Sequence, residues 1–298
     1  MNHPGRIIVV GDVITDVVAM LSGPLVTGSD TPARIRFSGG GQAANTAAWI
    51  AAQGSDVTLV GAIGDDEAGR DRVAELERAG VRCAVDRHEG YPTGTVIVLT
   101  TDGERTMASQ RGANLRLSAA HVDGALAAAP DAAHLHLSAY TLLDAASRGA
   151  GLRALAAARE RGLTTSVDAA SAAPLRRVGA AFLTWVRDVD LLLVNTDEAT
   201  VLAGGLDPAA QARALSATAR AVVVKRGAAG ALWVDRSGPV VTAEARRVVA
   251  VDVTGAGDAF AAGLLTAWLA GADRRTALDR AGDLGALAVT TVGARPAA

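Results

Sequence analysis

Short apolar runs alternate with Ala-, Arg- and Glu-rich segments along most of the chain. The apolar runs are continuous rather than alternating with polar residues, as expected for strands that are covered on both faces. They predict strands over Arg6–Gly11, Asp56–Val60, Ala132–Leu137, Thr164–Val167, Asp190–Val194 and Ala221–Lys225. The segments between and after them predict helices over Gly41–Gln53, Glu67–Ala79, Leu142–Arg161, Leu175–Val186, Thr196–Ala203, Gly257–Gly271 and Asp273–Val292. This alternation predicts an α/β fold with a mostly parallel sheet between two layers of helices.

Two segments depart from this alternation. Val13–Phe37 contains strand-like pieces with no long helix between them, and Thr93–Ser109 reads as a hairpin with Asp102 and Gly103 at its turn. They predict either a small β lid over one end of the main sheet or a simple extension of its edge. Because no repeat or linker interrupts the chain, we expect a single domain over residues 1–298, with the lid at approximately 13–37 and 93–109.

Composition narrows the class of protein. Half of the 298 residues are hydrophobic, so the chain can bury a large core, and 29 basic against 31 acidic residues give a net charge of −2. This balance excludes the strong positive field expected of a partner for nucleic acid or anionic membranes. The longest apolar helix candidate, Ala259–Gly271, is shorter than the roughly 20 residues that a membrane span requires. The single cysteine, Cys83, cannot form an internal disulfide, which indicates a cytoplasmic protein.

The sharpest local signal is the segment Ala250–Phe260, where an apolar strand leads through small residues into an apolar helix. Gly255, Ala256 and Gly257 would present backbone N–H groups to an anion at the helix start, and Asp258 follows in the first turn. Asp258 can be interpreted simply as an acidic residue matched to the helix dipole. Beside an anion-binding loop, however, a carboxylate suits phosphoryl transfer, in which the attacking hydroxyl must lose a proton.

Other nucleotide-binding architectures do not fit. A dinucleotide-binding fold requires G-x-G-x-x-G, which the loop does not complete. Lys225 is the only lysine and is followed by Arg226, so no P-loop is present. A Ser-His-Asp hydrolase would usually carry G-x-S-x-G, and that motif is also absent from the sequence.

The loop is one of several motifs, in order along the chain, that resemble the ribokinase-like, or PfkB, carbohydrate kinases. These motifs are G-D-V-I-T-D at 11–16, G-G-G-Q-A-A-N at 39–45, G-A-I-G-D-D-E-A-G at 61–69, N-T-D-E at 195–198, K-R-G-A-A-G at 225–230 and D-V-T-G-A-G-D-A-F at 252–260. The resemblance implies a three-layer α/β/α sandwich with a small β lid. It also implies an active site in the groove between the lid and the main sheet, where Asp258 is the catalytic base and the amides of 255–257 cradle the anion.

The resemblance also implies roles for other residues. The substrate would be bound by Asp16, Gly40, Gly41 and Asn45. The nucleotide with its Mg²⁺ would be bound by Asn195, Glu198 (through water to Mg²⁺), Lys225, Gly227 and Gly230. Asp252 would help to hold a monovalent cation such as K⁺, together with the segment 292–294. The plain structural alternatives are a turn or helix cap at Asp16, Gly41 and Asn195, a solvated cation at Lys225, and a structural carboxylate at Asp252.

We therefore expect an ATP- and Mg²⁺-dependent kinase that acts on a small sugar. The segment Gly112–Ser118 resembles the ribokinase branch and favours ribose, whereas Gln42 and the absence of a glutamate in 136–140 do not. A nucleoside or sugar-acid kinase is the alternative, and a non-catalytic binding protein on the same fold is a third. A phosphosugar ranks lower, because no arginine or lysine cluster is visible near Asp16 or Asn45, although Arg105 and Arg111 flank the lid hairpin. The sequence does not determine the oligomeric state, although exposed lid edges could pair two subunits as a homodimer.

Overall fold

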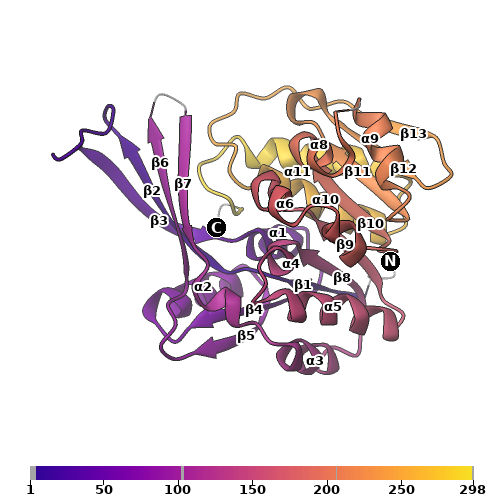
Figure 1. The fold of residues 1–298 in the computed structure, drawn as a ribbon, viewed down its shortest axis with the longest axis horizontal. Coiled ribbons are helices and arrows are strands. Elements are labelled where there is room, and N and C mark those ends of the chain that lie inside the picture. The colour runs from indigo at the N-terminus through magenta and orange to yellow at the C-terminus, as the bar shows by residue number, and fades with distance from the viewer. Residues whose placement is uncertain (1–4, 102–103, 206, 297–298) are drawn as a thin grey trace.

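The computed structural model describes residues 5–101, 104–205 and 207–296. Within them, nine strands form the main sheet in the order β13-β12-β11-β10-β9-β8-β1-β4-β5 (Figure 1). Neighbouring strands pair in parallel from β11 to β5, whereas β12 and β13 extend one edge antiparallel. The strands are β1 (Arg6–Val10), β4 (Val57–Gly64), β5 (Arg82–His88), β8 (Ala132–Ser138), β9 (Thr164–Asp168), β10 (Leu191–Asn195), β11 (Ala221–Lys225), β12 (Ala231–Asp235) and β13 (Val240–Ala243).

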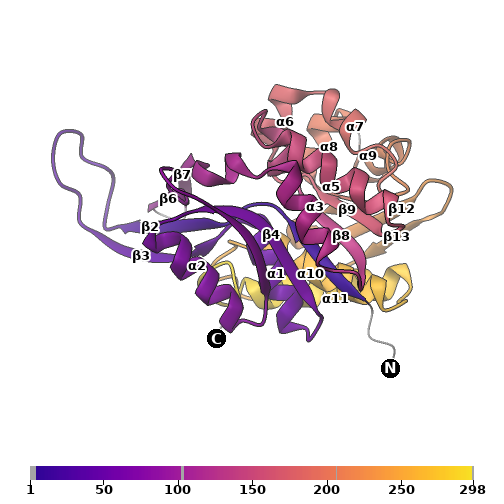
Figure 2. The same ribbon diagram turned by 90° about the horizontal axis from the view of Figure 1, so that it is seen from below.

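Helices cover both faces of this sheet, as Figure 2 shows. One face carries α3 (Ala119–Ala127), α4 (Tyr140–Leu143), α5 (Arg148–Glu160), α6 (Ala172–Val178), α7 (Ala181–Trp185), α8 (Thr196–Ala203) and α9 (Pro208–Leu215). The other carries α1 (Gln42–Ala52), α2 (Glu67–Arg78), α10 (Ala256–Leu269) and α11 (Arg274–Ala288). Successive residues of β1 alternate between the two cores, Ile8 and Val10 on the first face and Ile7 and Val9 on the second. The predicted three-layer α/β/α architecture is confirmed.

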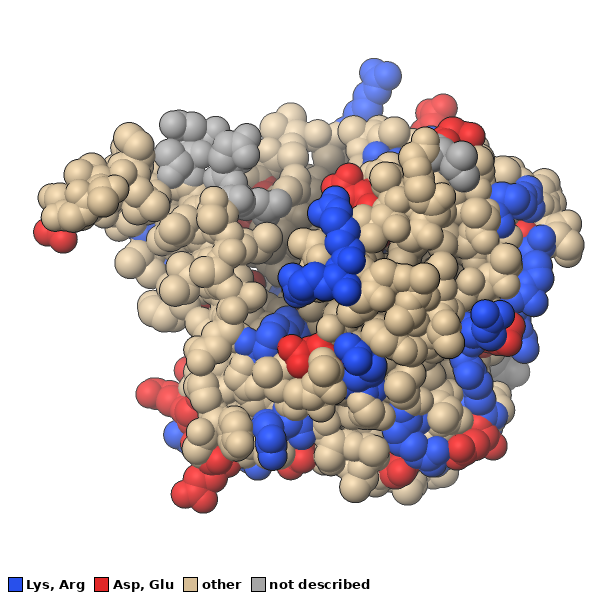
Figure 3. All heavy atoms as spheres, viewed as in Figure 1, with Lys and Arg blue, Asp and Glu red and all other residues tan. Residues whose placement is uncertain are grey.

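A second sheet stands at one end of the first and forms the predicted lid (Figure 1). Its strands lie in the order β3-β2-β6-β7, with β2 and β6 parallel and the outer pairs antiparallel. They are β2 (Ile14–Leu21), β3 (Ala33–Gly40), β6 (Gly94–Thr101) and β7 (Glu104–Gln110). The predicted turn residues Asp102 and Gly103 lie outside the described residues. On the face shown in Figure 3, the surface is hollowed between the lid and the larger lobe. Acidic and basic side chains are interspersed over the larger lobe.

Some element predictions need correction. The expected helix 142–161 is two helices, because Asp144 adopts an extended conformation and its side chain accepts a hydrogen bond from the N–H of Ala146. The expected helix 175–186 also divides, because Gly179 ends α6 with a φ of 57°. The edge strands β5 and β13, the inner strand β12 and the helices α3 and α9 were not expected. Among the helices that the structure describes, none combines the length and apolarity needed to cross a bilayer.

The topology brings the motifs together. Parallel strands end at the same edge of a sheet, so the segments after β1, β8, β9, β10 and β11 meet there, which is where α/β proteins bind ligands. The helices α1 and α10, which pack against each other, begin at the same edge. The lid strand β3 runs directly into α1, and this places the glycine-rich segment 39–41 between the lid and the main sheet.

Candidate active site

The anion loop and its carboxylate open α10. Gly255 is the N-cap and adopts a left-handed conformation with a φ of 76°. A Cβ atom at this position would lie 2.4 Å from the carbonyl oxygen of Ala294. Both the positive φ and this close approach therefore require glycine at position 255. Asp258 lies in the first turn of the helix, and its Oδ2 accepts a hydrogen bond of 2.9 Å from Nδ2 of Asn45 on α1. The two ends of the sequence therefore meet at the proposed base.

The protein environment raises the pKa of Asp258 to about 8. Burial is the main cause and the carboxylate of Asp168 adds to it, while the hydrogen bond from Asn45 and the charge of Lys225 act in the opposite direction. A carboxyl group with a pKa close to neutrality can take a proton from a hydroxyl group and later release it to solvent. This property distinguishes Asp258 from an ordinary helix-start aspartate.

A polar cavity of about 410 Å³ lies beside Asp258. It collects side chains and backbone from the ends of β9, β10 and β11 and from the start of α10. Its lining residues are Gln42, Asp168, Ala170, Asn195, Thr196, Asp197, Glu198, Lys225, Gly227, Gly257 and Asp258. The structure thus brings together six residues that the sequence predicted for catalysis or for the nucleotide: Asn195, Glu198, Lys225, Gly227, Gly257 and Asp258.

Lys225 is not a solvated cation. Its side chain is 14% exposed, and its Nζ lies 2.5 Å from Oδ2 of Asp168, which is 1% exposed. Burial alone would lower the pKa of Lys225, but the carboxylates of Asp168 and Glu198 outweigh that effect and raise it. Sequence reasoning missed Asp168, although its position at the end of the predicted strand 164–167 was the available signal.

Asn195 and Glu198 form a reciprocal capping box at the start of α8. Oδ1 of Asn195 accepts from the N–H of Glu198 at 2.9 Å, and Oε2 of Glu198 accepts from the N–H of Asn195 at 2.7 Å. The structural alternative, in which Asn195 caps a helix, is therefore confirmed. Both residues also line the polar cavity, so capping does not exclude a role in nucleotide binding. Burial raises the pKa of Glu198 to about 7, while Lys225 lowers it, so the protonation of this carboxyl depends on the charges placed next to it.

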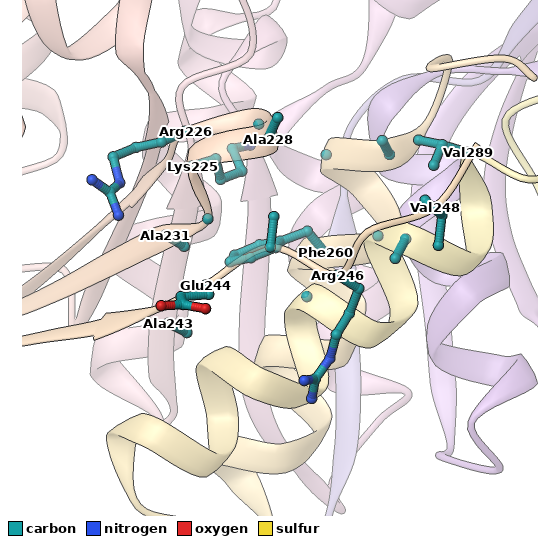
Figure 4. Close-up of a pocket in the computed structure, with 18 of the residues that line it drawn as sticks. Lys225, Arg226, Ala228, Ala231, Ala243, Glu244, Arg246, Val248, Phe260 and Val289 are labelled. Carbon is teal, nitrogen blue, oxygen red and sulfur yellow. The ribbon is translucent and has the colours of Figure 1, made fainter. Parts of the chain in front are cut away.

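An apolar cavity of about 360 Å³ adjoins the polar one and shares Lys225, Gly227 and Gly257 with it. Figure 4 shows Phe260 between the turn that carries Lys225 and Ala228 on one side and Val248 on the other. The turn depends on Gly230, which has a φ of 81° and would place a Cβ atom 2.0 Å from the carbonyl oxygen of Ala243.

The predicted substrate residues lie on the lid side of Asp258. The carboxylate of Asp16, on β2, occupies the space beside Gly40, where a Cβ atom would lie 2.2 Å from Oδ2 of Asp16. Gly41 is the N-cap of α1 with a φ of 96°. Burial raises the pKa of Asp16 to about 6, while Arg295 lowers it. Together with Asn45, which donates to Asp258, these residues form a cluster of polar groups of the kind that binds hydroxyl groups.

Four further residues of the substrate side have no assigned role in the sequence motifs. Asp12 follows β1, and its Oδ1 accepts from the N–H of Ala43 at 3.2 Å. Its Oδ2 lies 3.4 Å from the guanidinium of Arg111, which in turn stacks 4.3 Å from the centre of the Tyr140 ring. Asp12 directly follows the predicted strand 6–11, and Tyr140 comes three residues after the predicted strand 132–137; these positions were the signal that could have found them. Arg295, described below, contacts Asn45. The expectation that no arginines gather near Asp16 and Asn45 is therefore wrong.

Asp252 organises the segment before the anion loop. Its Oδ1 accepts from the N–H and the hydroxyl of Thr254 at 2.9 and 2.6 Å, and its Oδ2 accepts from the N–H of Gly293 at 3.0 Å. The carboxylate therefore joins the two segments that the sequence assigned to a monovalent cation. Within the part of the chain that the structure describes, no three His, Cys, Asp or Glu residues cluster in a way that would hold a metal ion.

Comparison with known proteins identifies relatives of the whole chain. The family model described as pfkB family carbohydrate kinase matches residues 5–298. An ATP-dependent ribose-1-phosphate kinase of Halopiger xanaduensis is 33% identical over 273 residues, which are 88% of this chain and 84% of that protein. A 2-dehydro-3-deoxygluconokinase of Thermoproteus tenax is 32% identical over 79% of this chain and 74% of its own. Among solved structures, a candidate ribokinase II of E. coli in complex with ATP and Mg²⁺ superposes with a TM-score of 0.86 at 23% identity, covering 97% of this chain and 94% of that one.

Proposed function

The chain belongs to the pfkB family of carbohydrate kinases, and from that premise we propose that it transfers a phosphoryl group from ATP to a hydroxyl group of a small sugar. The observation that carries the proposal is Asp258. It lies between the polar cavity and the substrate residues, and its pKa of about 8 suits a general base.

The two adjoining cavities fit a nucleotide and its phosphates. Phe260, Val248 and Val289 line an apolar space suited to a flat base, and Lys225 stands where this space meets the polar cavity. Mg²⁺ is commonly held by one or two carboxylates together with phosphate oxygens, and Asn195 and Glu198 are the residues that would hold it, Glu198 through water. When bound, MgATP supplies the phosphoryl group and neutralises charge that develops during transfer.

The chain's own residues then perform four tasks. Asp16, Gly40 and Asn45 hold the sugar so that one hydroxyl group faces Asp258. The carboxylate of Asp258 takes the proton of that hydroxyl group, which makes the oxygen a better nucleophile. The N–H groups of 255–257, at the start of α10, donate to the transferring anion. The lid sheet closes over the sugar and excludes water.

The charges of the substrate side favour a neutral polyol. Asp12 and Asp16 are both carboxylates, which accept hydrogen bonds from hydroxyl groups. A pentose or hexose is therefore our first candidate, and a nucleoside or a sugar acid is an alternative on the same site. A sugar phosphate is a further candidate substrate, because Arg111 could bind its phosphate group. The guanidinium of Arg111 is fixed between Asp12 and Tyr140, beside the substrate residues. The relative that acts on ribose 1-phosphate supports the same candidate.

The test is ADP release from MgATP by the wild type and by Asp258→Asn. The panel contains D-ribose, D-fructose, ribose 1-phosphate, adenosine and 2-dehydro-3-deoxygluconate, each measured with K⁺ and with Na⁺. We expect turnover on one substrate and a loss of at least ~10²-fold in Asp258→Asn. Full turnover in that variant would refute the assignment of the base. A dependence on K⁺ would support the cation role of Asp252.

Arg111 separates the neutral from the anionic substrates. If the substrate is a sugar phosphate, Arg111→Gln should raise its KM by roughly tenfold or more, because a charge-assisted hydrogen bond is lost. If the substrate is neutral, the same variant should change KM much less. Arg116→Gln is the matched control, because Arg116 also stacks on a tyrosine, with its guanidinium 4.8 Å from the ring of Tyr91.

A further inference from the structure

The C-terminal segment Gly293–Arg295 lies across the active site and is fixed at two points. The N–H of Gly293 donates to Oδ2 of Asp252 at 3.0 Å, next to the anion loop. Nε1 of Trp49, on α1, donates to the carbonyl oxygen of Ala294 at 3.0 Å. The backbone that carries Arg295 is therefore held against both α1 and the segment that leads into α10.

The side chain of Arg295 points back into the substrate side and is 13% exposed. Its Nη2 donates to the carbonyl oxygen of Gly40 at 3.0 Å, and its Nε donates to Oδ1 of Asn45 at 3.2 Å. Nη1 lies 3.4 Å from Oε2 of Glu75, which neutralises the charge. Gly39 leaves room for the guanidinium, since a Cβ atom there would lie 2.2 Å from Nη1.

These contacts determine which way the amide of Asn45 faces. A guanidinium has only donors, so it can satisfy only the oxygen of the amide. The nitrogen is then left to donate to Asp258, which it does at 2.9 Å. A reversed amide would present its NH₂ group to the guanidinium, which is a repulsive contact between donors. It would also present its oxygen to Asp258, which is repulsive whenever that carboxyl group is ionised.

We propose that Arg295 is a positioning residue for phosphoryl transfer, which orients the amide of Asn45 toward Asp258 and holds the carbonyl of Gly40 in the substrate loop. This inference rests on the proposed function, because it takes Asp258 to be the base.

The donor from Asn45 stabilises the charged form of Asp258 and lowers its pKa against the effect of burial. Without Arg295, the amide can rotate and this donor is lost for part of the time. The other groups that act on or lie near Asp258 stay in place, so the change is specific; they are Asp12, Tyr140, Asp168 and Lys225.

The first experiment needs no substrate. The full chain is labelled with ¹³C at the aspartate carboxyl carbons, and the resonance of Asp258 is assigned by its disappearance in Asp258→Asn. We expect the pKa of Asp258 to rise by about one unit in Arg295→Ala, as the loss of one hydrogen bond to a carboxylate predicts. Arg6→Ala is the matched control, because Arg6 is also ion-paired and 17% exposed but lies at the opposite end of β1. An unchanged pKa in Arg295→Ala overturns the proposal.

The second experiment follows kcat against pH on the panel substrate that supports turnover. In Arg295→Ala the acid limb of the profile should move to higher pH by about one unit, as the pKa of Asp258 does. At pH values on that limb, kcat should therefore be about tenfold lower than in the wild type. KM should also rise, because the carbonyl of Gly40 is released. Arg295→Lys keeps the charge but not the fork of donors, so it should restore only part of kcat. A uniform loss of kcat with an unmoved limb would make Arg295 merely structural and overturns the proposal.

Gly39→Ala gives an independent route to the same displacement, and it decides the matter if Arg295→Ala does not fold. Its added Cβ atom pushes the end of the Arg295 side chain aside without requiring a positive φ. As a single variant, Gly39→Ala should shift the acid limb of the kcat profile to higher pH. Combined with Arg295→Ala, it should produce no further shift. Additive effects would contradict the proposal. If Asp258→Asn retains full turnover, the proposed function fails, whereas an inactive Asp258→Asn with an unmoved limb in Arg295→Ala refutes only the role of Arg295.

Discussion

The raised pKa of Asp258 means that the proposed base destabilises the fold that carries it. An ordinary aspartate titrates near 3.8, and this one titrates near 8. Between these values, the unfolded chain releases the proton while the folded chain retains it. Stability therefore falls as pH rises through this window, which is the reverse of the usual effect of a paired carboxylate. Asp258→Asn keeps a neutral group of nearly the same shape and should abolish this dependence.

The magnitude follows from the width of the window. Each pH unit between the two pKa values costs about 1.4 kcal/mol of stability. From pH 4 to pH 7 this gives an upper limit of about 4 kcal/mol. Water entry and local relaxation reduce such penalties in real proteins, so we expect the variant to gain about 1–3 kcal/mol at pH 7. The gain should be smallest near pH 4 and largest above pH 8.

Urea denaturation of both proteins at pH 5, 7 and 9 measures this difference directly. The same preparations report ADP release, which should fall by at least ~10²-fold in the variant. If Asp258→Asn is both more stable and inactive, Asp258 is a residue that serves function and lowers the stability of the fold. A stability difference that does not grow with pH would show that the carboxyl group of Asp258 is not held in its neutral form by burial, and the reasoning above would fail.

Other predictions concern the same site. The kcat/KM of the wild type should fall tenfold for each unit below about pH 8, because the free enzyme must hold Asp258 deprotonated; a flat profile from pH 6 to 9 would exclude it as the base. Lys225→Met leaves Asp168 buried without its partner and should cost about 3–5 kcal/mol in urea denaturation, most of which Asp168→Asn in the same chain recovers. Gly230→Ala meets both a φ of 81° and the Ala243 carbonyl, so it should destabilise the protein by about 1–3 kcal/mol and weaken ATP binding in calorimetry; the control Gly124→Ala, in an open helical position, should do neither.

Much of the fold could be predicted because its strands are continuous apolar runs. Ala221–Lys225 was predicted to the residue, and β1, β8, β9 and β10 to within one residue at each end. The edge strand β5 was missed because its apolar run, Cys83–Val85, is only three residues long and lies between polar residues, and because it pairs with a single neighbour. The interruption at Asp144 depends on one side-chain hydrogen bond, which helix periodicity does not reveal.

The candidate site was predictable where its residues belong to contiguous motifs. Gly255, Gly257 and Asp258 share one loop, so their spacing alone indicates an anion site beside a carboxylate. Asp168 and Arg295 have no such motif. Their roles depend on contacts with Lys225 and Asn45, which lie 57 and 250 residues away in the sequence, and only the folded chain brings them together.

The contact between Asn45 and Arg295 also has a consequence for biosynthesis. A nascent chain can build most of the central sheet before residue 295 emerges from the ribosome, but it cannot complete the proposed catalytic centre until then. Closing a contact over 250 residues is entropically expensive and slow compared with local folding. The onset of turnover during synthesis would therefore report that residue 295 has emerged from the ribosome and joined Asn45.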